Sequence, residues 1–364
     1  MKIAIVAPLV SPIREPQRGG SQAFVSELAR GLLVRGHDVH LYAASGSEVR
    51  GVEVIDTGVD HRDLADTLYR ASGAAAGGSM AAEGAFARVY ATVRERRYDV
   101  VHNHAFDAPA VRLASALGAP VVHTVHLPPD ADVADALREA VRCDPPAAVA
   151  CVSAHQALEW RQVIPVDGIL PPYVPTRQIP FSPMPGTGAL FAGRLSPEKG
   201  AAEAVAIARI AGVPIDVFGD SYDAEYAREL IDAQSADAGV AMHPGVPQTA
   251  LWDAMARAAV VLCPAKWEEP FGMVAAEAQA CGTPVVAFRR GALDEVIIDG
   301  LTGSLVAPDD LNGAADAVGR AQELSRRACR EHAETDLDIE RSLDAHEQLY
   351  GRVASAGLGA RTGG

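Results

Sequence analysis

Two glutamates eight positions apart, Glu269 and Glu277, mark the segment of this sequence best suited to chemistry, residues 268–277 (EEPFGMVAAE). An apolar run typical of a strand precedes the segment, and a helix is expected to begin near Gly272 and Met273. A helix N-terminus carries unpaired N–H groups and the positive end of a dipole, so it suits a diphosphate. Glu269 is then placed to reach sugar hydroxyls and Glu277 to accept hydrogen bonds from a ribose. The alternative is a solvated surface helix, which the alanines beside Glu277 disfavour.

A second segment, residues 193–200 (GRLSPEKG), places two cations five positions apart after another apolar run. Gly193 ends the expected strand, and Arg194 and Lys199 follow it. A guanidinium can bind two phosphate oxygens at once, and an ammonium adds a compact charge. Together they can neutralise a departing diphosphate, a task that a divalent metal performs elsewhere. A surface turn with unrelated cations is the alternative.

Polar residues also follow the expected strands of the first half of the chain. His104, His126 and Ser153 each end an apolar run, so they would face one edge of a sheet. The pair Gly19–Gly20 precedes the first expected helix, with Ser21 as its N-cap. Glycine permits close approach of the backbone to a phosphate, although a plain turn explains the pair equally well. An isolated histidine is more often structural than catalytic, so these assignments depend on the fold.

Short apolar runs alternate with helical segments along the whole chain. The runs are continuous, as expected for parallel strands covered on both faces. Their alternation with helices predicts an α/β fold with two doubly wound, Rossmann-like sheets, in which ligands bind at the carboxyl ends of the strands. The main runs span residues 3–8, 39–43, 99–102, 120–124, 147–152, 189–192, 215–218, 260–262 and 284–288.

Composition and charge bound the classes of function. The chain has 364 residues, 49% hydrophobic and 22% charged, which is enough for two domains with separate cores. Its net charge of −15 argues against nucleic acid as a partner and against strong attachment to anionic membranes. Five scattered cysteines without a C-x-x-C pair favour a reduced, cytoplasmic protein. A proline-rich stretch over residues 170–188 suits a connector between the domains.

The segments 193–200 and 268–277, with residues 291–303 (GALDEVIIDGLTG), resemble the glycogen-synthase-like retaining glycosyltransferases, family four, with the GT-B fold. The resemblance covers nearly the whole chain, and its specific motifs lie in the second half. It implies a spaced glutamate pair, two diphosphate-binding cations, backbone contacts to the donor, a glycine-rich phosphate loop and a histidine beside the reacting sugar. The glutamate pair would be Glu269 and Glu277, and the two cations Arg194 and Lys199. The backbone contacts to the donor would come from Phe271, Gly272 and Met273, and the phosphate loop would hold Gly19 and Gly20. The histidine beside the sugar would be His126.

The resemblance also implies the domain plan and the reaction. Residues 1–172 would form an acceptor-binding domain and residues 173–338 a donor-binding domain, with a helix over about 339–352 packing back on the first. The expected enzyme transfers a hexose from a nucleotide diphosphate sugar, by default a UDP-sugar, to a hydroxyl of a small-molecule, glycan or lipid acceptor. The implied reaction needs no cofactor and no metal, and Gly193 would lie with the cations beside the donor. Self-association into a homodimer is left open.

Two departures and several alternatives accompany this interpretation. The linker carries Pro172–Pro175 (PYVP) where the family has an Asn-Gly-Val-Asp-like turn, and Arg290 with Ala292 replaces a commoner glycine pair. A metal-dependent hydrolase built on the histidines of 102–104 (HNH) and 123–126 (HTVH) is one alternative. A sugar-nucleotide epimerase of the same fold is another. Two D-x-D patterns, at residues 130–132 and 336–338, mark metal-dependent transferases of a different fold and occur easily by chance in an acidic chain. A nicotinamide oxidoreductase is disfavoured because no G-x-G-x-x-G follows the first strand.

Overall fold

The computed structural model describes the chain except residues 18, 65–76, 222–224, 229, 231–238 and 363–364. It divides into two units. The first comprises Met1–Arg14, Ser21–Pro171 and Ser342–Gly364, and the second comprises Glu15–Gly20 and Pro172–Arg341. The boundary between the two main segments falls within the proline-rich stretch. Among the described residues, no helix is long and apolar enough to cross a membrane.

The first unit is built on a seven-stranded sheet in which every neighbouring pair is parallel. In spatial order the strands are β3 (Glu53–Asp56), β2 (Asp38–Ala43), β1 (Lys2–Val6), β4 (Val100–Asn103), β5 (Val121–Val125), β6 (Ala148–Cys151) and β7 (Gly168–Ile169). The helical elements are α1 (Gly20–Val34), η1 (His61–Leu64), α2 (Gly77–Arg96), α3 (Ala108–Ser115), α4 (Ala131–Ala140), α5 (Ala154–Trp160) and α13 (Ile339–Thr362).

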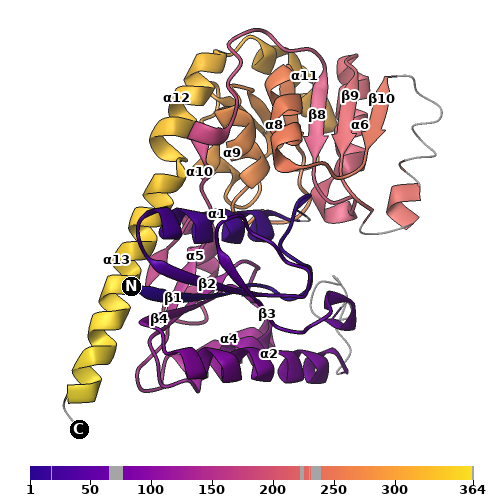
Figure 1. The fold of residues 1–364 in the computed structure, drawn as a ribbon. Helices are drawn as coiled ribbons and strands as arrows, with labels where there is room; N and C mark the ends of the chain where they lie inside the picture. The colour runs from indigo at the N-terminus through magenta and orange to yellow at the C-terminus, as the bar shows by residue number, and fades with distance from the viewer. Residues whose placement is uncertain (18, 65–76, 222–224, 229, 231–238, 363–364) are drawn as a thin grey trace. The chain divides into compact units, whose positions relative to one another are not determined.

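Helices cover both faces of this first sheet, which explains its continuous apolar strands. Side chains of α2, α3, α4 and α5 form one core with alternate residues of the strands. The helices contribute Phe86, Leu137 and Trp160, among others. Figure 1 shows α2 and α4 on one side of the strands and α1 on the other. Helix α13 packs closely on α1, because a Cβ added at Gly31 would lie 2.7 Å from Cδ1 of Leu343.

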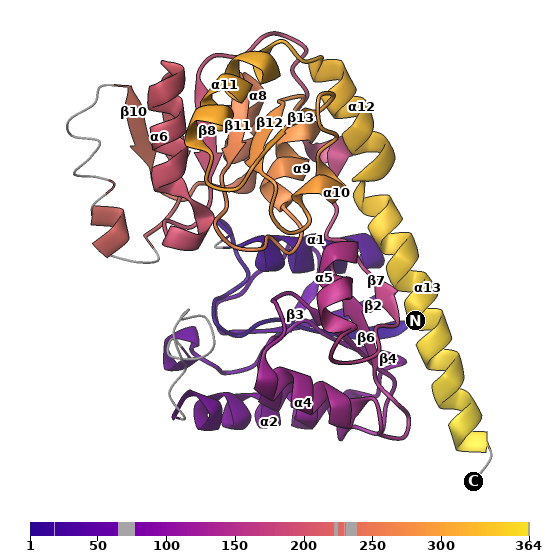
Figure 2. The same cartoon turned by 180° about the vertical axis from the view of Figure 1, so that it is seen from behind.

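The second unit repeats the plan with a six-stranded parallel sheet (Figure 2). Its strands are, in spatial order, β10 (Val240–His243), β9 (Ile215–Phe218), β8 (Ala189–Ala192), β11 (Val260–Cys263), β12 (Val285–Phe288) and β13 (Gly303–Val306). Its helical elements are η2 (Thr176–Gln178), η3 (Pro197–Lys199), α6 (Ala201–Ala211), α8 (Gln248–Arg257), α9 (Met273–Ala280), α10 (Leu293–Val296), α11 (Leu311–Gln322) and α12 (Arg326–Asp336). Two Rossmann-like α/β units confirm the predicted fold class.

Helices again pack against both faces of the second sheet. Helices α6 and α11 share one core with β8, β9, β11 and β12. Helix α9 contacts β11 and β12, and it also packs against α8 and α12. Helix α9 therefore stands between the sheet and two other helices, which fixes the direction in which its N-terminus points.

Some local predictions differ from the structure. Ser21 was expected to cap the first helix, but α1 begins at Gly20 and the Ser21 hydroxyl donates to Gln22 Oε1 at 3.0 Å. Helix α13 extends beyond residue 352 to Thr362. The two D-x-D patterns have structural uses: Asp130 caps α4, and Asp338 accepts the backbone N–H of Glu340 at the start of α13.

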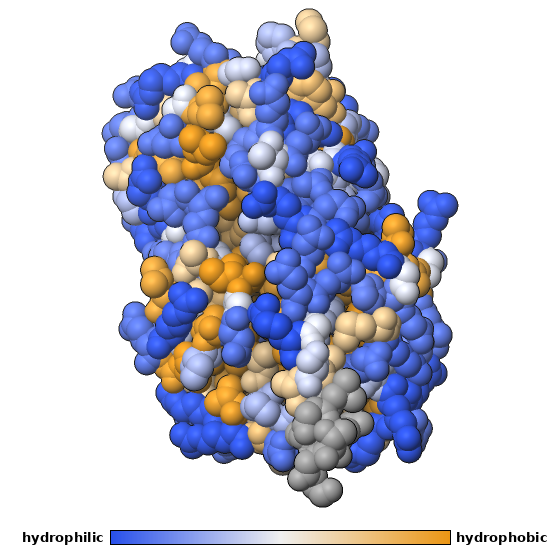
Figure 3. Space-filling model, turned by 90° about the vertical axis from the view of Figure 1, so that its left-hand side faces the viewer, coloured by the Kyte–Doolittle hydropathy of each residue, from blue (hydrophilic) through white to orange (hydrophobic). Residues whose placement is uncertain are grey.

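The surface and the cysteines agree with the composition. Hydrophilic residues cover most of the face shown in Figure 3, as expected for a chain with a net charge of −15. All five cysteines are free thiols: Cys143, Cys151, Cys263, Cys281 and Cys329.

Candidate active site

The N-terminus of α9 is shaped by a glycine in a left-handed conformation. Gly272 precedes the helix with a φ of 102°, which disfavours any residue with a side chain. A Cβ at this position would lie 2.7 Å from Cδ2 of Leu293, so a larger residue would also have to displace that buried side chain. Phe271 is buried beside it and Met273 is the first helical residue. Helix α9 therefore begins where the sequence predicted a helix start, with the unpaired N–H groups of its first turn following Gly272.

Glu277 lies inside α9, slightly more than one turn from its start, and it is buried with 5% of its surface exposed. Its Oε1 accepts hydrogen bonds from Gln248 Nε2 at 2.8 Å and from Trp252 Nε1 at 3.1 Å. Two neutral donors thus hold a buried carboxylate in a fixed orientation. The alternative interpretation, a solvated surface helix, is wrong for Glu277 because this residue is buried. The sequence did not single out Gln248 or Trp252, which lie on α8.

Lys199 and Glu269 bring the two predicted motifs together. Lys199 Nζ lies 2.7 Å from Glu269 Oε2, and both side chains are largely shielded from solvent. The same carboxylate oxygen accepts a hydrogen bond of 2.8 Å from Trp267 Nε1. The ammonium also lies 4.6 Å from the centroid of the Trp267 ring. Trp267 is a residue that the sequence reasoning missed, although its position two residues before Glu269 was visible.

Arg194 follows β8 directly, after Gly193. One of its guanidinium nitrogens lies 3.5 Å from Glu198 Oε1, and Glu198 in turn accepts a hydrogen bond of 2.6 Å from the Ser196 hydroxyl. The backbone here is tightly packed, because a Cβ added at Gly219 would lie 1.9 Å from the carbonyl oxygen of Gly193. The strand end and its neighbouring loop therefore fix where the Arg194 side chain begins.

A second tight turn packs against the backbone of Glu269. Gly291 has a φ of 61°, and a Cβ there would lie 2.2 Å from the carbonyl oxygen of Glu269. Its N–H donates to Glu268 Oε2 at 2.6 Å, and the N–H of Ala292 donates to the Glu269 carbonyl at 2.8 Å. The unusual Arg290 pairs with Asp309 at 2.7 Å and also lies 3.9 Å from Glu268 Oε1. Glu268 and Gly291 thus support the loop that carries Glu269.

The remaining second-unit predictions concern the linker and the glycine pair. Tyr173, in the departure from the family's linker turn, contacts Phe271 with ring centroids 5.7 Å apart. Residues Glu15–Gly20 group with the second unit. A Cβ at Gly20 would lie 3.1 Å from Sδ of Met273, so a larger residue there would have to shift the methionine side chain by a few tenths of an ångström. Gly19 lies one residue before α1.

In the first unit, alternation along β4 and β5 sends histidines to opposite faces of the sheet. His102 and His104 face α1 and α13, where they meet His126 and His346. Nδ1 of His104 lies 3.0 Å from Nε2 of His126, and the rings of His102 and His104 have centroids 3.9 Å apart. Nitrogens of His102 hydrogen-bond the hydroxyls of Tyr350 at 2.6 Å and Thr124 at 2.7 Å. His104 and His126 are therefore brought together as predicted from the strand ends.

Burial keeps these histidines neutral. It lowers the pKa of His126 to about 4, with a further contribution from His346. Burial lowers the pKa of His346 to about 4 as well, although the carbonyl of Ser342 accepts a hydrogen bond from its Nδ1 at 2.7 Å. The pKa values of His102 and His104 also fall well below their ordinary range, mainly through burial. His126, partly exposed at the strand end, is then a neutral hydrogen-bonding group near neutral pH.

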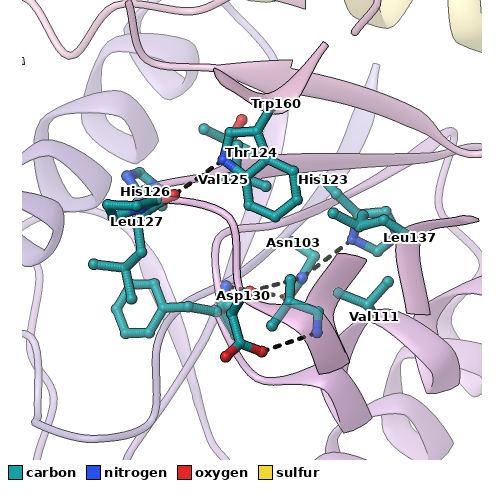
Figure 4. A pocket seen from close by; sticks show the side chains of 14 residues that line it. Asn103, Val111, His123, Thr124, Val125, His126, Leu127, Asp130, Leu137 and Trp160 are labelled. Atoms are coloured by element: carbon teal, nitrogen blue, oxygen red, sulfur yellow. Dashed lines mark hydrogen bonds between the residues drawn. The ribbon is translucent and has the colours of Figure 1, made fainter. Parts of the chain in front are cut away.

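The end of β5 and the loop that follows it, residues 123–128, line a small cavity of about 30 Å³ (Figure 4). Its walls are mostly apolar and come from β5, α3, α4 and α5, and His126 and His123 both contribute to the lining. Nδ1 of His123 accepts a hydrogen bond from the Asn103 amide at 3.2 Å. The orientation of the Asn103 amide is fixed, because it donates to the Ala105 carbonyl and accepts from the Ala105 N–H. Ser153, by contrast, is buried and caps α5 by accepting from the N–H of Gln156.

The histidines at the ends of β4 and β5 pair with neighbouring side chains. Within the part of the chain that the structure describes, no group of three or more His, Cys, Asp or Glu residues could hold a metal ion. His102 is instead engaged by two hydroxyls and His123 by an amide. The thiol of Cys263, near Lys199 and Glu269, has a pKa raised to about 12, mainly by burial, so it is not a thiolate nucleophile.

Two parallel-sheet units with these motifs define the class of GT-B glycosyltransferases. The solved structure of sucrose-phosphate synthase from Thermosynechococcus elongatus shares this fold, with a TM-score of 0.79 and 18% sequence identity. The match covers 98% of this chain and all of that chain. Anabaena HepE in complex with UDP-glucose gives a TM-score of 0.72 at 17% identity, with 98% of this chain and all of that chain covered.

Sequence comparison specifies the family. Residues 176–336 match the model described as glycosyl transferases group 1, and residues 18–177 match glycosyltransferase family 4. A D-inositol 3-phosphate glycosyltransferase of Acidothermus cellulolyticus is 31% identical, over 90% of this chain and 84% of the relative. The chain therefore belongs to the family 4 glycosyltransferases with the GT-B fold.

Proposed function

We propose that this glycosyltransferase moves a hexose from a UDP-sugar to a hydroxyl acceptor, with retention of anomeric configuration and without a metal ion. The observation that carries the proposal is the 2.7 Å contact between Lys199 and Glu269. It joins the cationic segment that follows β8 to the segment that opens α9, so that a phosphate-binding cation and a sugar-binding carboxylate lie side by side within the second unit.

The diphosphate would lie at the N-terminus of α9. Helical N–H groups and the dipole favour negative charge there. Arg194 and Lys199 supply two further positive charges, which take the place of a divalent cation as the bond between the sugar and the phosphate breaks. Removing one donor that stabilises developing charge typically lowers kcat by ~100-fold or more. Gly193 and Gly272 would let the backbone approach the phosphates closely.

The nucleoside and the sugar would extend to the two sides of the diphosphate. Glu277, already oriented by Gln248 and Trp252, would accept hydrogen bonds from the ribose hydroxyls. Glu269 would accept hydrogen bonds from sugar hydroxyls. The choice of uridine is supported by Anabaena HepE, a structural neighbour solved with UDP-glucose. The retaining course is supported by the family's spaced glutamate pair, which is present here as Glu269 and Glu277.

The acceptor would be a small polyhydroxylated molecule or glycan, bound by the first unit. The name of the Acidothermus cellulolyticus relative, a D-inositol 3-phosphate glycosyltransferase, supports a polyol acceptor. His126 would position the reacting groups as a neutral hydrogen-bonding side chain, because its pKa is lowered to about 4. Its neighbour His104 holds the ring through the 3.0 Å contact.

Product analysis tests this proposal. The protein, treated with EDTA, is incubated with UDP-glucose or UDP-N-acetylglucosamine and a panel of inositols, inositol phosphates and sugars. The expected result is UDP release that depends on an acceptor, with an α-glycoside as the product by NMR. A β-glycoside would contradict retention, and an absolute need for added divalent metal would contradict the role of Arg194 and Lys199.

A further inference from the structure

A tryptophan contacts both members of the ion pair at the centre of the candidate donor site. Trp267 lies in the loop between β11 and α9 and is partly exposed. Its indole Nε1 donates to Glu269 Oε2 at 2.8 Å, and Lys199 Nζ lies 4.6 Å from the centroid of its ring. The third side of the triangle is the 2.7 Å bond between Lys199 and the same Oε2. One side chain thus offers a hydrogen-bond donor to the anion and an aromatic face to the cation.

These contacts use only part of the hydrogen-bonding capacity of Glu269 and Lys199. Oε2 of Glu269 accepts both bonds, and among the described residues Oε1 of Glu269 makes no hydrogen bond. A carboxylate oxygen left in this state can accept from a hydroxyl. The Lys199 ammonium has three N–H groups, of which Glu269 takes one and the indole face attracts the charge without taking a second. Both groups can therefore bind a ligand without giving up their contact with each other.

We propose that Trp267 is a positioning residue that orients Glu269 toward a hydroxyl of the donor sugar and Lys199 toward the diphosphate. The inference rests on the proposed function. Its indole N–H holds the carboxylate so that Oε1 is the oxygen presented to the sugar. Its ring face holds the ammonium against Glu269 while the remaining N–H groups serve the phosphate. The triangle thereby favours a nucleotide that carries a sugar over the free nucleoside diphosphate.

Two substitutions separate the two contacts. Trp267→Phe keeps an aromatic face for Lys199 but removes the N–H that Glu269 accepts. Trp267→Leu removes both. Lys266→Gln is the matched control, because Lys266 adjoins Trp267 in the same loop but is exposed and pairs with Glu203 at 2.9 Å. Binding of UDP-glucose and of UDP to the full chain is measured by calorimetry for each variant.

Trp267→Phe is expected to weaken UDP-glucose binding about tenfold, the effect of one charge-assisted hydrogen bond, with UDP binding unchanged. Trp267→Leu is expected to weaken binding of both ligands, and Lys266→Gln of neither. The double variant Trp267→Phe/Glu269→Gln should bind UDP-glucose no more weakly than Glu269→Gln alone, since the indole acts through that carboxylate.

Equal losses for UDP-glucose and UDP in Trp267→Phe would overturn the proposal, because a merely structural tryptophan affects both ligands alike. Unchanged UDP-glucose binding in Trp267→Phe would overturn it too. Additive losses in the double variant would do the same. If the unsubstituted chain bound neither ligand, the proposed function itself would fail, which is a different result from tight binding that ignores Trp267.

Discussion

The hydroxyl of Tyr350 lies 2.6 Å from Nδ1 of His102, although 248 positions separate the two residues in the sequence. Both side chains are fully buried. The contact ties the end of the chain, in α13, to the central strand β4 of the first unit. It shows how the last helix completes the first unit: α13 supplies polar as well as apolar partners to the face of the sheet that α1 covers.

Removal of this hydroxyl should destabilise the first unit. Tyr350→Phe leaves a buried nitrogen of His102 without its partner, so we expect a loss of about 1 to 3 kcal/mol in the free energy of unfolding. Ser355→Ala is the control, because its hydroxyl bonds the Gly351 carbonyl on an exposed part of the same helix. Urea denaturation followed by circular dichroism gives both values. Equal, negligible effects would show that the buried contact contributes nothing.

Acid should weaken the first unit through its buried histidines. Burial holds the pKa of His102, His104, His123, His126 and His346 below the ordinary value, to about 3 for His123 and about 4 for His126 and His346. An unfolded histidine titrates near pH 6.5, so below that pH the unfolded chain binds more protons than the folded one. Stability is therefore fully present above about pH 6.5 and is lost as the pH falls toward about 4, by up to about 1.4 kcal/mol per pH unit for each histidine.

The measurement is the urea midpoint of the full chain between pH 8 and pH 5. A steady fall below about pH 6.5 is expected. His346→Gln should flatten the fall, because one of the five histidines no longer takes up a proton on unfolding. A midpoint that stayed constant over this range would contradict the burial of neutral imidazoles.

Glu277→Gln should weaken nucleotide binding by roughly ten- to a hundredfold, because a charge-assisted hydrogen bond to a ribose hydroxyl becomes a neutral one in a buried setting. The substitution keeps the shape of the side chain and the acceptor for Gln248 and Trp252. Glu323→Gln, on the exposed end of α11, serves as the control. Calorimetric titration with UDP measures both, and equal affinities would remove Glu277 from the ribose site.

Gly272→Ala should be costlier than the same change at another left-handed glycine. Gly272 and Gly300 have φ values of 102° and 78°, but only at Gly272 would the added Cβ meet a neighbour, Leu293, at 2.7 Å. We expect about 1 kcal/mol for Gly300→Ala and roughly 2 to 4 kcal/mol for Gly272→Ala in the free energy of unfolding. Urea denaturation compares them. Similar losses in the free energy of unfolding at both sites would show that Leu293 moves aside without cost and would contradict this prediction.

Much of the fold could be predicted because buried parallel strands leave a strong signal. The runs at residues 189–192 and 215–218 match β8 and β9 residue for residue. The predicted start of the first helix was wrong, since Ser21 has the chemistry of an N-cap yet lies inside α1. A cap depends on backbone angles that neighbouring turns decide, and residue type alone does not fix them.

The motif residues of the candidate site were predictable from their spacing, but their partners were not. The approach of Lys199 to Glu269 depends on loops that follow two neighbouring strands, β8 and β11. The roles of Trp267 and Trp252 depend on where each indole N–H points, which a sequence does not show. The histidine cluster likewise needed α13 to bring His346 beside His102.

Calorimetric titration of the EDTA-treated protein with UDP, GDP and ADP, and with their glucose conjugates, tests the central claim most directly. The account predicts saturable binding of UDP and UDP-glucose at one site per chain without any metal, and a marked loss of both in Lys199→Ala. Binding that appeared only after a divalent metal was added, or that was unchanged in Lys199→Ala, would contradict it.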